Sequence, residues 1–218
     1  MNKISELKEK IKASHNAGIA LDIDETLSWT IGYWVEKMFE NFGNPENLTI
    51  EQVISKYRYT QNVPYWQTEE AMQWMHDHRE DNALQKELPL IENSQRCVNE
   101  INKVVPIVAY ITTRPASVIS GTKDWLRKHK FPEAEVIARP KEVDHSDGNK
   151  WKAKVLEELY PVVHGIVDDN PGLVEYLSVE YRGRIYLYNF YGECRDDLDI
   201  VKCSDWLEVE KSILGNSE

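Results

Sequence analysis

Short apolar segments that alternate with helical patterns constrain the fold of this chain more than any other feature of its sequence. The segments are rich in Val and Ile and show little polar alternation, as strands that are covered on both faces do. They occupy residues 18–23, 104–111, 134–138, 162–168 and 184–189. Helical patterns separate or follow the later segments, so the alternation predicts an α/β protein with a parallel, five-stranded sheet and helices on both faces.

A different pattern fills the region between the first and second apolar segments. Three helical patches fit it, at residues 31–42, 50–59 and 68–80, with Gly and Pro breakers between them. The region contains ten aromatic residues and no convincing strand. We therefore expect an α/β core made of residues 1–29 and 96–218, with a helical cap subdomain at 30–95.

The overall charge argues against binding to a nucleic-acid polymer, and the lack of long apolar runs argues against a membrane-spanning protein. The 218 residues carry a formal net charge of −11, which argues against a protein that grips a nucleic-acid polymer by its phosphates. No apolar run is long enough to cross a bilayer, and the first residues resemble an amphipathic helix rather than an export signal. The cysteines, Cys97, Cys194 and Cys203, form no CxxC pair, so we expect reduced thiols in a cytoplasmic protein.

Two pairs of acids directly follow two of the predicted strands. Asp22 and Asp24 lie in the segment LDIDETL, and Asp168 and Asp169 lie in GIVDDNP. Residues two apart on an extended chain point to one side, so Asp22 and Asp24 could both address one reacting centre. Two acidic pairs at neighbouring strand ends would repel each other without a cation, and carboxylates together with a phosphate are suitable ligands for Mg²⁺.

Candidate phosphate-binding groups lie between these acidic pairs. Thr112 and Thr113 follow a predicted strand in YITTRP, and Arg114 adds a charge that could pair with a phosphate. The helix at 150–160 offers further cations near its start, with Lys150, Lys152 and Lys154 in competition.

The order of these four motifs along the chain resembles the signature of the haloacid dehalogenase superfamily. LDIDETL resembles its first motif, YITTRP its second, a lysine in NKWKAKVLEEL its third and IVDDNP its fourth. The resemblance spans roughly residues 16–190 without the insert, and it implies a Rossmann-like sheet. It also implies a phosphatase whose cap covers the active site and selects the substrate.

The resemblance implies a role for each acid. Asp22 matches the family nucleophile, which accepts the phosphoryl group as an aspartyl-phosphate, and Asp24 matches the general acid and base. Mg²⁺ should bind the Asp22 carboxylate, the Asp24 backbone carbonyl and one acid of the DD motif. We expect Asp169 to be the direct ligand and Asp168 to orient its neighbours.

The resemblance also implies roles for residues of the second and third motifs. Thr112 resembles the hydroxyl donor to the transferred phosphoryl group. Lys152 best matches the register of the family lysine, because Val155 and Leu156 follow it at helical spacing, and Lys150 is the alternative.

The cap resembles that of deoxyribonucleotidases in this superfamily, which suggests a small phosphorylated metabolite, such as a nucleotide, as the substrate. Most aromatic residues of this region are expected to form the cap's own small core. Trp29, Tyr33 and Trp34 lie closest to Asp24 in sequence and are the candidate substrate contacts. Two alternatives are a phosphatase that acts on a protein or a nucleic-acid end, and a non-catalytic binding module on the same fold.

Overall fold

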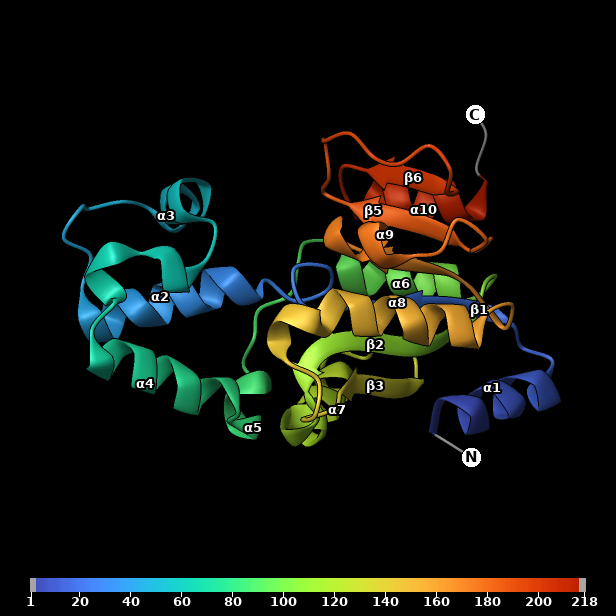
Figure 1. Cartoon of the computed structure of the whole chain (residues 1–218), viewed down its shortest axis with the longest axis horizontal. Coiled ribbons are helices and arrows are strands. Elements are labelled where there is room, and N and C mark those ends of the chain that lie inside the picture. Colours follow the sequence, from blue (N-terminus) through green and yellow to red (C-terminus); the bar gives the residue numbers. More distant parts are fainter. Residues whose placement is uncertain (1–2, 216–218) are drawn as a thin grey trace.

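Six parallel strands form the single sheet of the computed structural model, which describes residues 3–215. The strand order is β3-β2-β1-β4-β5-β6 (Figure 1). Parallel pairing confirms the expected class of sheet, but the expectation of five strands is wrong. The strands are β1 Gly18–Leu21, β2 Ile107–Pro115, β3 Glu135–Arg139, β4 Val163–Asp168, β5 Arg184–Tyr188 and β6 Ile200–Cys203.

The additional strand, β6, lies at one edge of the sheet and pairs only with β5. Its residues Ile200 and Val201 are half-buried, and Lys202 is exposed. A short, partly exposed edge strand produces no continuous apolar run, because only strands covered on both faces require one. The sequence pattern that predicted the inner strands therefore did not detect β6.

The second strand is displaced toward the C-terminus relative to its predicted range of 104–111. Val104 is 68% exposed, and the side chain of Asn102 accepts a hydrogen bond from the backbone N–H of Ile107 at 2.9 Å, which ends the preceding turn. The strand then continues to Pro115, which is paired with Arg139 on β3. The threonines of the second motif consequently lie within β2 rather than after it.

Helices cover both faces of the sheet, as the alternating pattern predicted. On one face α6, α7 and α10 pack against Leu21, Tyr110 and Val167, and on the other face α1, α8 and α9 pack against Ala20 and Ile111. Adjacent strand residues contribute to opposite faces because side chains alternate along a strand. These helices are α1 Lys3–Ser14, α6 Ser94–Asn102, α7 Ile119–Lys128, α8 Gly148–Leu159, α9 Gly172–Tyr176 and α10 Trp206–Leu214; the 3₁₀ turns η3 Ala116–Val118 and η4 His145–Asp147 precede α7 and α8.

The segment after β1 forms the helical insert, which lies to one side of the sheet in Figure 1. Thr49 caps α3 in a reciprocal capping box with Gln52, and Thr68 caps α4, so two of its helices begin where local side chains satisfy the first backbone N–H groups. Its elements are α2 Thr30–Phe42, α3 Ile50–Tyr57, η1 Thr60–Asn62, η2 Pro64–Trp66, α4 Glu69–Arg79 and α5 Asn82–Gln85.

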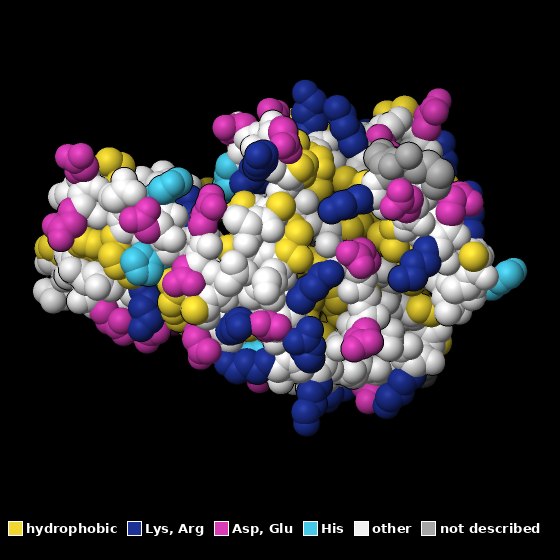
Figure 2. Space-filling view, turned by 90° about the horizontal axis from the view of Figure 1, so that it is seen from below, with side chains coloured by type: hydrophobic (Ala, Val, Ile, Leu, Met, Phe, Trp, Pro, Cys, Tyr) yellow, Lys and Arg dark blue, Asp and Glu magenta, His cyan; other side chains and the backbone are white. Residues whose placement is uncertain are grey.

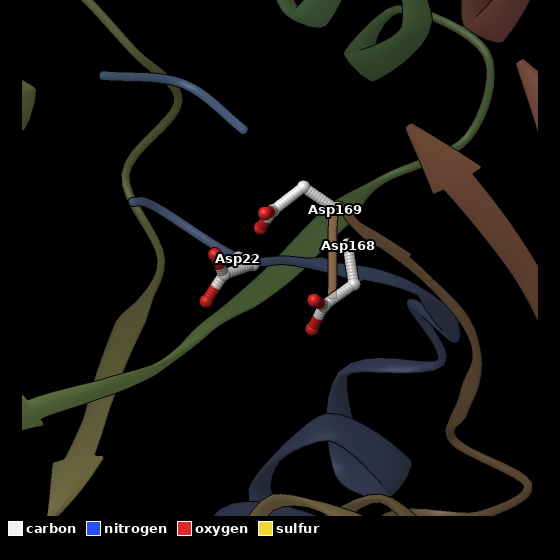
Figure 3. Close-up of side chains that lie close together, drawn as sticks. All are labelled: Asp22, Asp168 and Asp169. Atoms are coloured by element: carbon white, nitrogen blue, oxygen red, sulfur yellow. The ribbon is translucent and has the colours of Figure 1, made fainter. Parts of the chain in front are cut away.

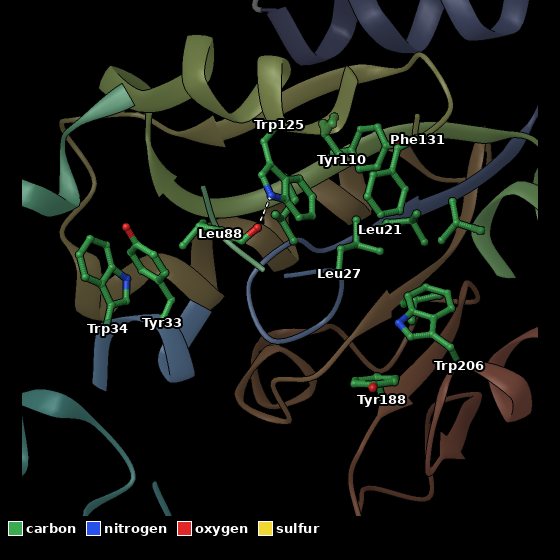
Figure 4. Close-up of a cluster of buried hydrophobic side chains, with 14 of the residues drawn as sticks. Leu21, Leu27, Tyr33, Trp34, Leu88, Tyr110, Trp125, Phe131, Tyr188 and Trp206 are labelled. Carbon is green, nitrogen blue, oxygen red and sulfur yellow. Dashed lines mark hydrogen bonds between the residues drawn. The ribbon is translucent and has the colours of Figure 1, made fainter. Parts of the chain in front are cut away.

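The insert and the sheet share one apolar cluster. Leu21 and Trp125 of the α/β part belong to the same buried group as Trp34 and Trp66 of the insert. Leu88 joins the two parts, because its carbonyl accepts a hydrogen bond from the Trp125 indole N–H at 2.7 Å (Figure 4). The insert is therefore packed onto the core and not only tethered to it.

The face opposite to the β6 edge carries a groove over the outer strand β3. Figure 2 shows Lys and Arg side chains around a hollow on this face. The groove has a volume of about 640 Å³ and is lined by residues from the start of β3 and from α7, together with Lys10 of α1. It lies at the amino end of β3, away from the strand ends that carry the acidic motifs. Among residues 3–215, no helix combines the length and apolar character needed to cross a membrane.

Candidate active site

The acidic motifs meet at the carboxyl ends of the two central strands. Asp22 directly follows β1, Asp168 ends β4, and the Asp22 backbone N–H donates to the Val167 carbonyl at 2.9 Å. The chain runs outward in opposite directions from these strands, because β2 and β3 lie on one side and β5 and β6 on the other. Open α/β sheets bind ligands in the crevice at such a switch point.

Three carboxylates gather there. Asp22, Asp168 and Asp169 each offer an oxygen, and these oxygens lie within 4.8 Å of one another (Figure 3). Burial raises the pKa of the Asp22 carboxyl to about 7 against the opposing effect of Lys152, and Asp168 and Asp24 add to the rise. Burial, together with Asp168 and Asp22, also raises the pKa of Asp169 well above its ordinary value. The cluster is thus short of positive charge and suited to a cation.

Lys152 supplies one buried positive charge to this cluster. Its ammonium group donates to Asp22 Oδ1 at 2.6 Å and to Asp168 Oδ2 at 2.7 Å, and its side chain is only 2% exposed. Burial lowers the pKa of Lys152, but Asp168 and Asp22 outweigh that effect and raise it. Lys150 is exposed on the same helix, so the structure brings Lys152 into the cluster and leaves Lys150 outside it.

The two acids of the DD motif have different surroundings. The Asp168 carboxylate is fully buried and accepts hydrogen bonds from Lys152 and from the Asn170 backbone N–H at 2.9 Å. Asp169 is less buried, and within residues 3–215 its carboxylate accepts a hydrogen bond only from the Thr26 hydroxyl, at 3.3 Å. Their side chains leave β4 in different directions in Figure 3. Asp169 therefore retains more free acceptor capacity for a metal ion.

Thr26 connects both sides of the cluster and was not identified from the sequence. Its hydroxyl lies 3.4 Å from Asp22 Oδ2 and accepts a hydrogen bond from the Asp169 backbone N–H at 3.2 Å. Its carbonyl accepts from the Trp206 indole N–H of α10 at 2.8 Å. The position of Thr26, four residues after Asp22 in a turn, was the only available signal, and it does not reveal contacts with residues more than a hundred positions away.

Asp24 is paired with a cation of the second motif. The Arg114 guanidinium donates to Asp24 Oδ1 at 2.7 Å, and its other contacts are the Ser28 and Thr122 hydroxyls. Although burial raises the pKa of Asp24, the attraction of Arg114 outweighs it and lowers that pKa below its ordinary value. Arg114 is thus engaged by protein groups in this arrangement.

The threonines of the second motif lie beside Arg114 in β2. Thr112 is buried, and its hydroxyl accepts the Arg114 backbone N–H at 3.2 Å. Thr113 is half-buried, and its carbonyl accepts a hydrogen bond from Arg139 Nε at 3.1 Å. Both residues are at the carboxyl end of the sheet, and no hydrogen bond within the described chain joins their hydroxyls to the acidic cluster.

Glu25 is a second residue that sequence reasoning did not assign to the site. Its φ of +58° lies in the left-handed region, and its carboxylate accepts the Ile31 backbone N–H at 2.6 Å. Burial raises the pKa of this carboxyl to about 8, despite the opposing hydrogen bond from Ile31. The N-cap residue of α2, Trp29, makes no side-chain hydrogen bond to the helix. The Glu25 carboxylate, from the loop that carries Asp22 and Asp24, accepts a backbone N–H of the first turn instead.

Two of the three aromatic candidates, Tyr33 and Trp34, are buried among other side chains. Tyr33 and Trp34 are each 8% exposed and pack edge-to-face with ring centroids 5.4 Å apart (Figure 4). Trp34 also packs against Trp74. Trp29 is half-buried and lies against Gly32, where a side chain would collide with its ring. This arrangement fits the expectation that these rings form the core of the insert.

Comparison with known proteins finds matches among solved structures, and finds none among protein-family models or curated proteins. A putative β-phosphoglucomutase from Thermotoga maritima is 17% identical, with 89% of this chain and 98% of the other covered and a TM-score of 0.51. A haloacid dehalogenase superfamily hydrolase from Ehrlichia chaffeensis is 14% identical, with 92% and 97% covered and a TM-score of 0.47. A cytosolic 5′-nucleotidase IIIB bound to cytidine is 13% identical, with 98% and 89% covered and a TM-score of 0.43.

Identities this low show a common fold and leave the activity open. The Thermotoga structure has the highest TM-score of the three, so the fold of this chain is compared with that structure. In this chain, the first, second and fourth motifs lie at the carboxyl ends of the parallel strands, and Lys152 of the third motif reaches them from α8. The chain therefore shares the α/β fold of the Thermotoga protein, with a parallel sheet covered by helices on both faces.

Proposed function

We propose that this protein is a Mg²⁺-dependent phosphatase that hydrolyses a small phosphomonoester through an aspartyl-phosphate on Asp22. The observation that carries the proposal is the group of three carboxylates at the switch point of the sheet, two buried and one half-buried, with Lys152 bridging Asp22 and Asp168. Perturbed acids in such a crevice are typical of catalytic sites. A purely structural role gives no reason to bury several like charges beside one another.

The donor set fits Mg²⁺. Three carboxylate oxygens within 4.8 Å of one another are hard ligands. Burial and then the neighbouring carboxylates raise the pKa values of Asp22 and Asp169, and a bound cation would favour their ionised forms. Asp22, Asp169 and the Asp24 backbone carbonyl would hold the ion, with Asp168 kept in place by Lys152. The ion would supply charge that offsets the carboxylates and the phosphate oxygens.

In the first step, an Asp22 carboxylate oxygen attacks phosphorus, and the bond from phosphorus to the ester oxygen breaks. Asp24 gives that leaving oxygen a proton. In the second step, Asp24 takes a proton from water, the water oxygen attacks phosphorus, and the phosphorus bond to Asp22 breaks. Phosphate leaves, and both carboxyl groups return to their starting states.

The other residues position these two acids. Lys152 and Thr26 hold Asp22 from two sides, which favours one orientation of the attacking oxygen. Arg114 and the Thr30 hydroxyl hold Asp24, the latter at 2.6 Å. Since Arg114 favours the ionised form of Asp24, we propose that Asp24 leaves this pair and takes up a proton from solvent before it protonates the leaving group.

Substitution of Asp22 tests the proposal. Asp22→Asn keeps the size of the side chain but removes the nucleophile, so release of phosphate from p-nitrophenyl phosphate in Mg²⁺ should fall by at least a thousandfold, a barrier increase of about 4 kcal/mol. Asp196→Asn, at an exposed aspartate of the loop before β6, is the matched control and should keep wild-type activity. Turnover by Asp22→Asn within about tenfold of wild type would exclude Asp22 as the nucleophile.

A panel of phosphorylated compounds tests the substrate class. Nucleotides, sugar phosphates and phosphopeptides should be compared by their kcat/KM values in the same buffer. We expect a small metabolite to be preferred, because a helical insert packs over the carboxyl side of the core. A preference for phosphopeptides would favour a protein phosphatase, and no release of phosphate from any compound would favour a binding module.

A further inference from the structure

The groove over β3 differs in charge from the rest of the molecule. The whole chain has 26 basic and 37 acidic side chains, but the lining of the groove has four basic and two acidic ones. These are Lys10, Lys123, Arg127 and Lys130, with Glu133 and Glu135. Lys and Arg side chains surround the hollow in Figure 2. The groove is therefore a cationic surface on an otherwise acidic protein.

One wall of the groove is a side of α7. Lys123, Arg127 and Lys130 are four and three residues apart, which places them along one side of the helix and of the turn that ends it. Leu126 also lines the groove and is buried in the core, as is Phe131. This wall therefore has positive charge at its rim and apolar side chains at its base.

The protein itself binds the cations of the groove only weakly. Lys123 lies 3.6 Å from Glu135, with both side chains exposed, and Arg127 pairs with Asp124 of its own helix although its side chain is 72% exposed. Within residues 3–215, neither Lys10 nor Lys130 takes part in an ion pair. Exposed ion pairs contribute little to stability, so carboxylates of a ligand could replace them without unfolding this region.

The other wall is the segment 131–136, which leads into the edge strand β3. β3 pairs only with β2, so no strand of the sheet lies along its outer side. Within residues 3–215, the backbone N–H groups of Glu133 and Ala134 donate no hydrogen bond. Unpaired main-chain groups at the edge of a sheet are a template for an extended segment of another chain. This wall thus offers main-chain donors close to the cations of α7.

These features fit an acidic peptide better than a nucleic acid. The phosphates of a nucleic acid would meet Glu133 and Glu135 as well as the cations, on a chain whose net charge is −11. An extended peptide can pair its carbonyls with the free N–H groups of the strand wall. Because side chains alternate along a strand, it can also direct acidic side chains toward α7 and apolar ones onto Leu126 and Phe131.

We propose that this groove is a docking site for an extended, acidic segment of a partner protein, which lies along the outer side of β3. Its carboxylates contact the cations of α7 and Lys10, and its main chain contacts the strand wall. The proposal does not depend on the phosphatase chemistry, because the groove lies at the amino end of β3, away from the acidic cluster.

Binding of a labelled peptide to the whole protein tests the proposal. The probe is a fluorescein-labelled peptide of about eight residues in which Glu alternates with Val, a length typical of a strand. Fluorescence anisotropy in low salt should give a Kd below about 100 µM, as for a transient contact of small area. Binding should weaken about fivefold or more in about 0.5 M NaCl, because salt screens exposed charges. A matched peptide with Lys in place of Glu should not bind.

Substitutions in the α7 wall test where the peptide binds. Lys123→Gln/Lys130→Gln should raise the Kd of the Glu–Val peptide by about tenfold without lowering the melting temperature, since both side chains lie at the surface. Lys123→Arg/Lys130→Arg keeps both charges and should stay within about threefold of the wild-type Kd. Lys141→Gln is the control, because Lys141 is exposed at the other end of β3 and takes part in no ion pair within the described chain.

Hydrogen exchange tests the contact with the strand wall. The backbone amides of Glu133 and Ala134, which donate to no acceptor within residues 3–215, should exchange more slowly when the Glu–Val peptide is bound. Absence of binding, equal binding of the Lys–Val peptide, or a Kd that Lys123→Gln/Lys130→Gln leaves unchanged would overturn the docking site. Tighter binding of a single-stranded oligonucleotide of similar length would replace the acidic peptide with a nucleic acid. Unchanged exchange at residues 131–136 would exclude the position along β3.

Discussion

At the scale of single residues, the two acids of the DD motif can be separated by experiment. Asp169→Ala should raise the Mg²⁺ concentration for half-maximal activity about tenfold to a hundredfold, because the less engaged carboxylate is lost. Asp168→Ala should leave that midpoint unchanged but lower the melting temperature without Mg²⁺, since Lys152 loses a buried partner. Activity titrations against Mg²⁺ and thermal melts of both variants decide this. If only Asp168→Ala raised the Mg²⁺ concentration for half-maximal activity, Asp168 and not Asp169 would be the metal ligand.

Site residues could be predicted where a short stretch of sequence around them carries the signal. Asp22 and Asp168 were found because a charge at the end of an apolar strand is conspicuous, and Lys152 because its helix register is readable. The pairing of Arg114 with Asp24 was not found, since it joins positions 90 residues apart and depends on how the two strand ends turn. Thr26 was missed for the same reason.

At the scale of elements, the start of α2 depends on Glu25. Glu25→Ala should destabilise the protein by about 1 kcal/mol, the usual cost of losing a side-chain cap, and so lower the melting temperature by about 2–4 °C for a chain of this size. Glu25→Gln keeps an acceptor oxygen for the Ile31 N–H and the same left-handed backbone, so it should lose much less. Thermal melts of both variants measure the difference. Equal loss in both would show that an acceptor oxygen at position 25 is not sufficient to stabilise the start of α2.

The elements that were predicted well are those with a periodic apolar pattern. The inner strands and the amphipathic helices have one, because each buries a defined face. The edge strand β6 has no such pattern, and the start of β2 was placed too early because Val104 and Val105 precede a proline in a turn that sequence alone does not distinguish from a strand. Edges and ends of elements depend on tertiary pairing more than on local pattern.

At the scale of the whole molecule, the shared apolar cluster predicts how the chain unfolds. Since Leu88 and Trp125 join the insert to the core, both parts should unfold in one transition, with equal calorimetric and van't Hoff enthalpies. Differential scanning calorimetry measures this. Two separate transitions would mean that the insert is an independent domain.

The central claim is that Asp22 carries the phosphoryl group, and detection of the covalent intermediate tests it most directly. Asp24→Asn should slow hydrolysis of the aspartyl-phosphate, while the good leaving group of p-nitrophenyl phosphate still allows it to form. After rapid acid quenching in the presence of Mg²⁺, tandem mass spectrometry should locate a phosphoryl group on Asp22, and none should be found on Asp22→Asn/Asp24→Asn. A wild-type enzyme that releases phosphate, with no phosphoryl group on Asp22 in the quenched variant, would contradict the account.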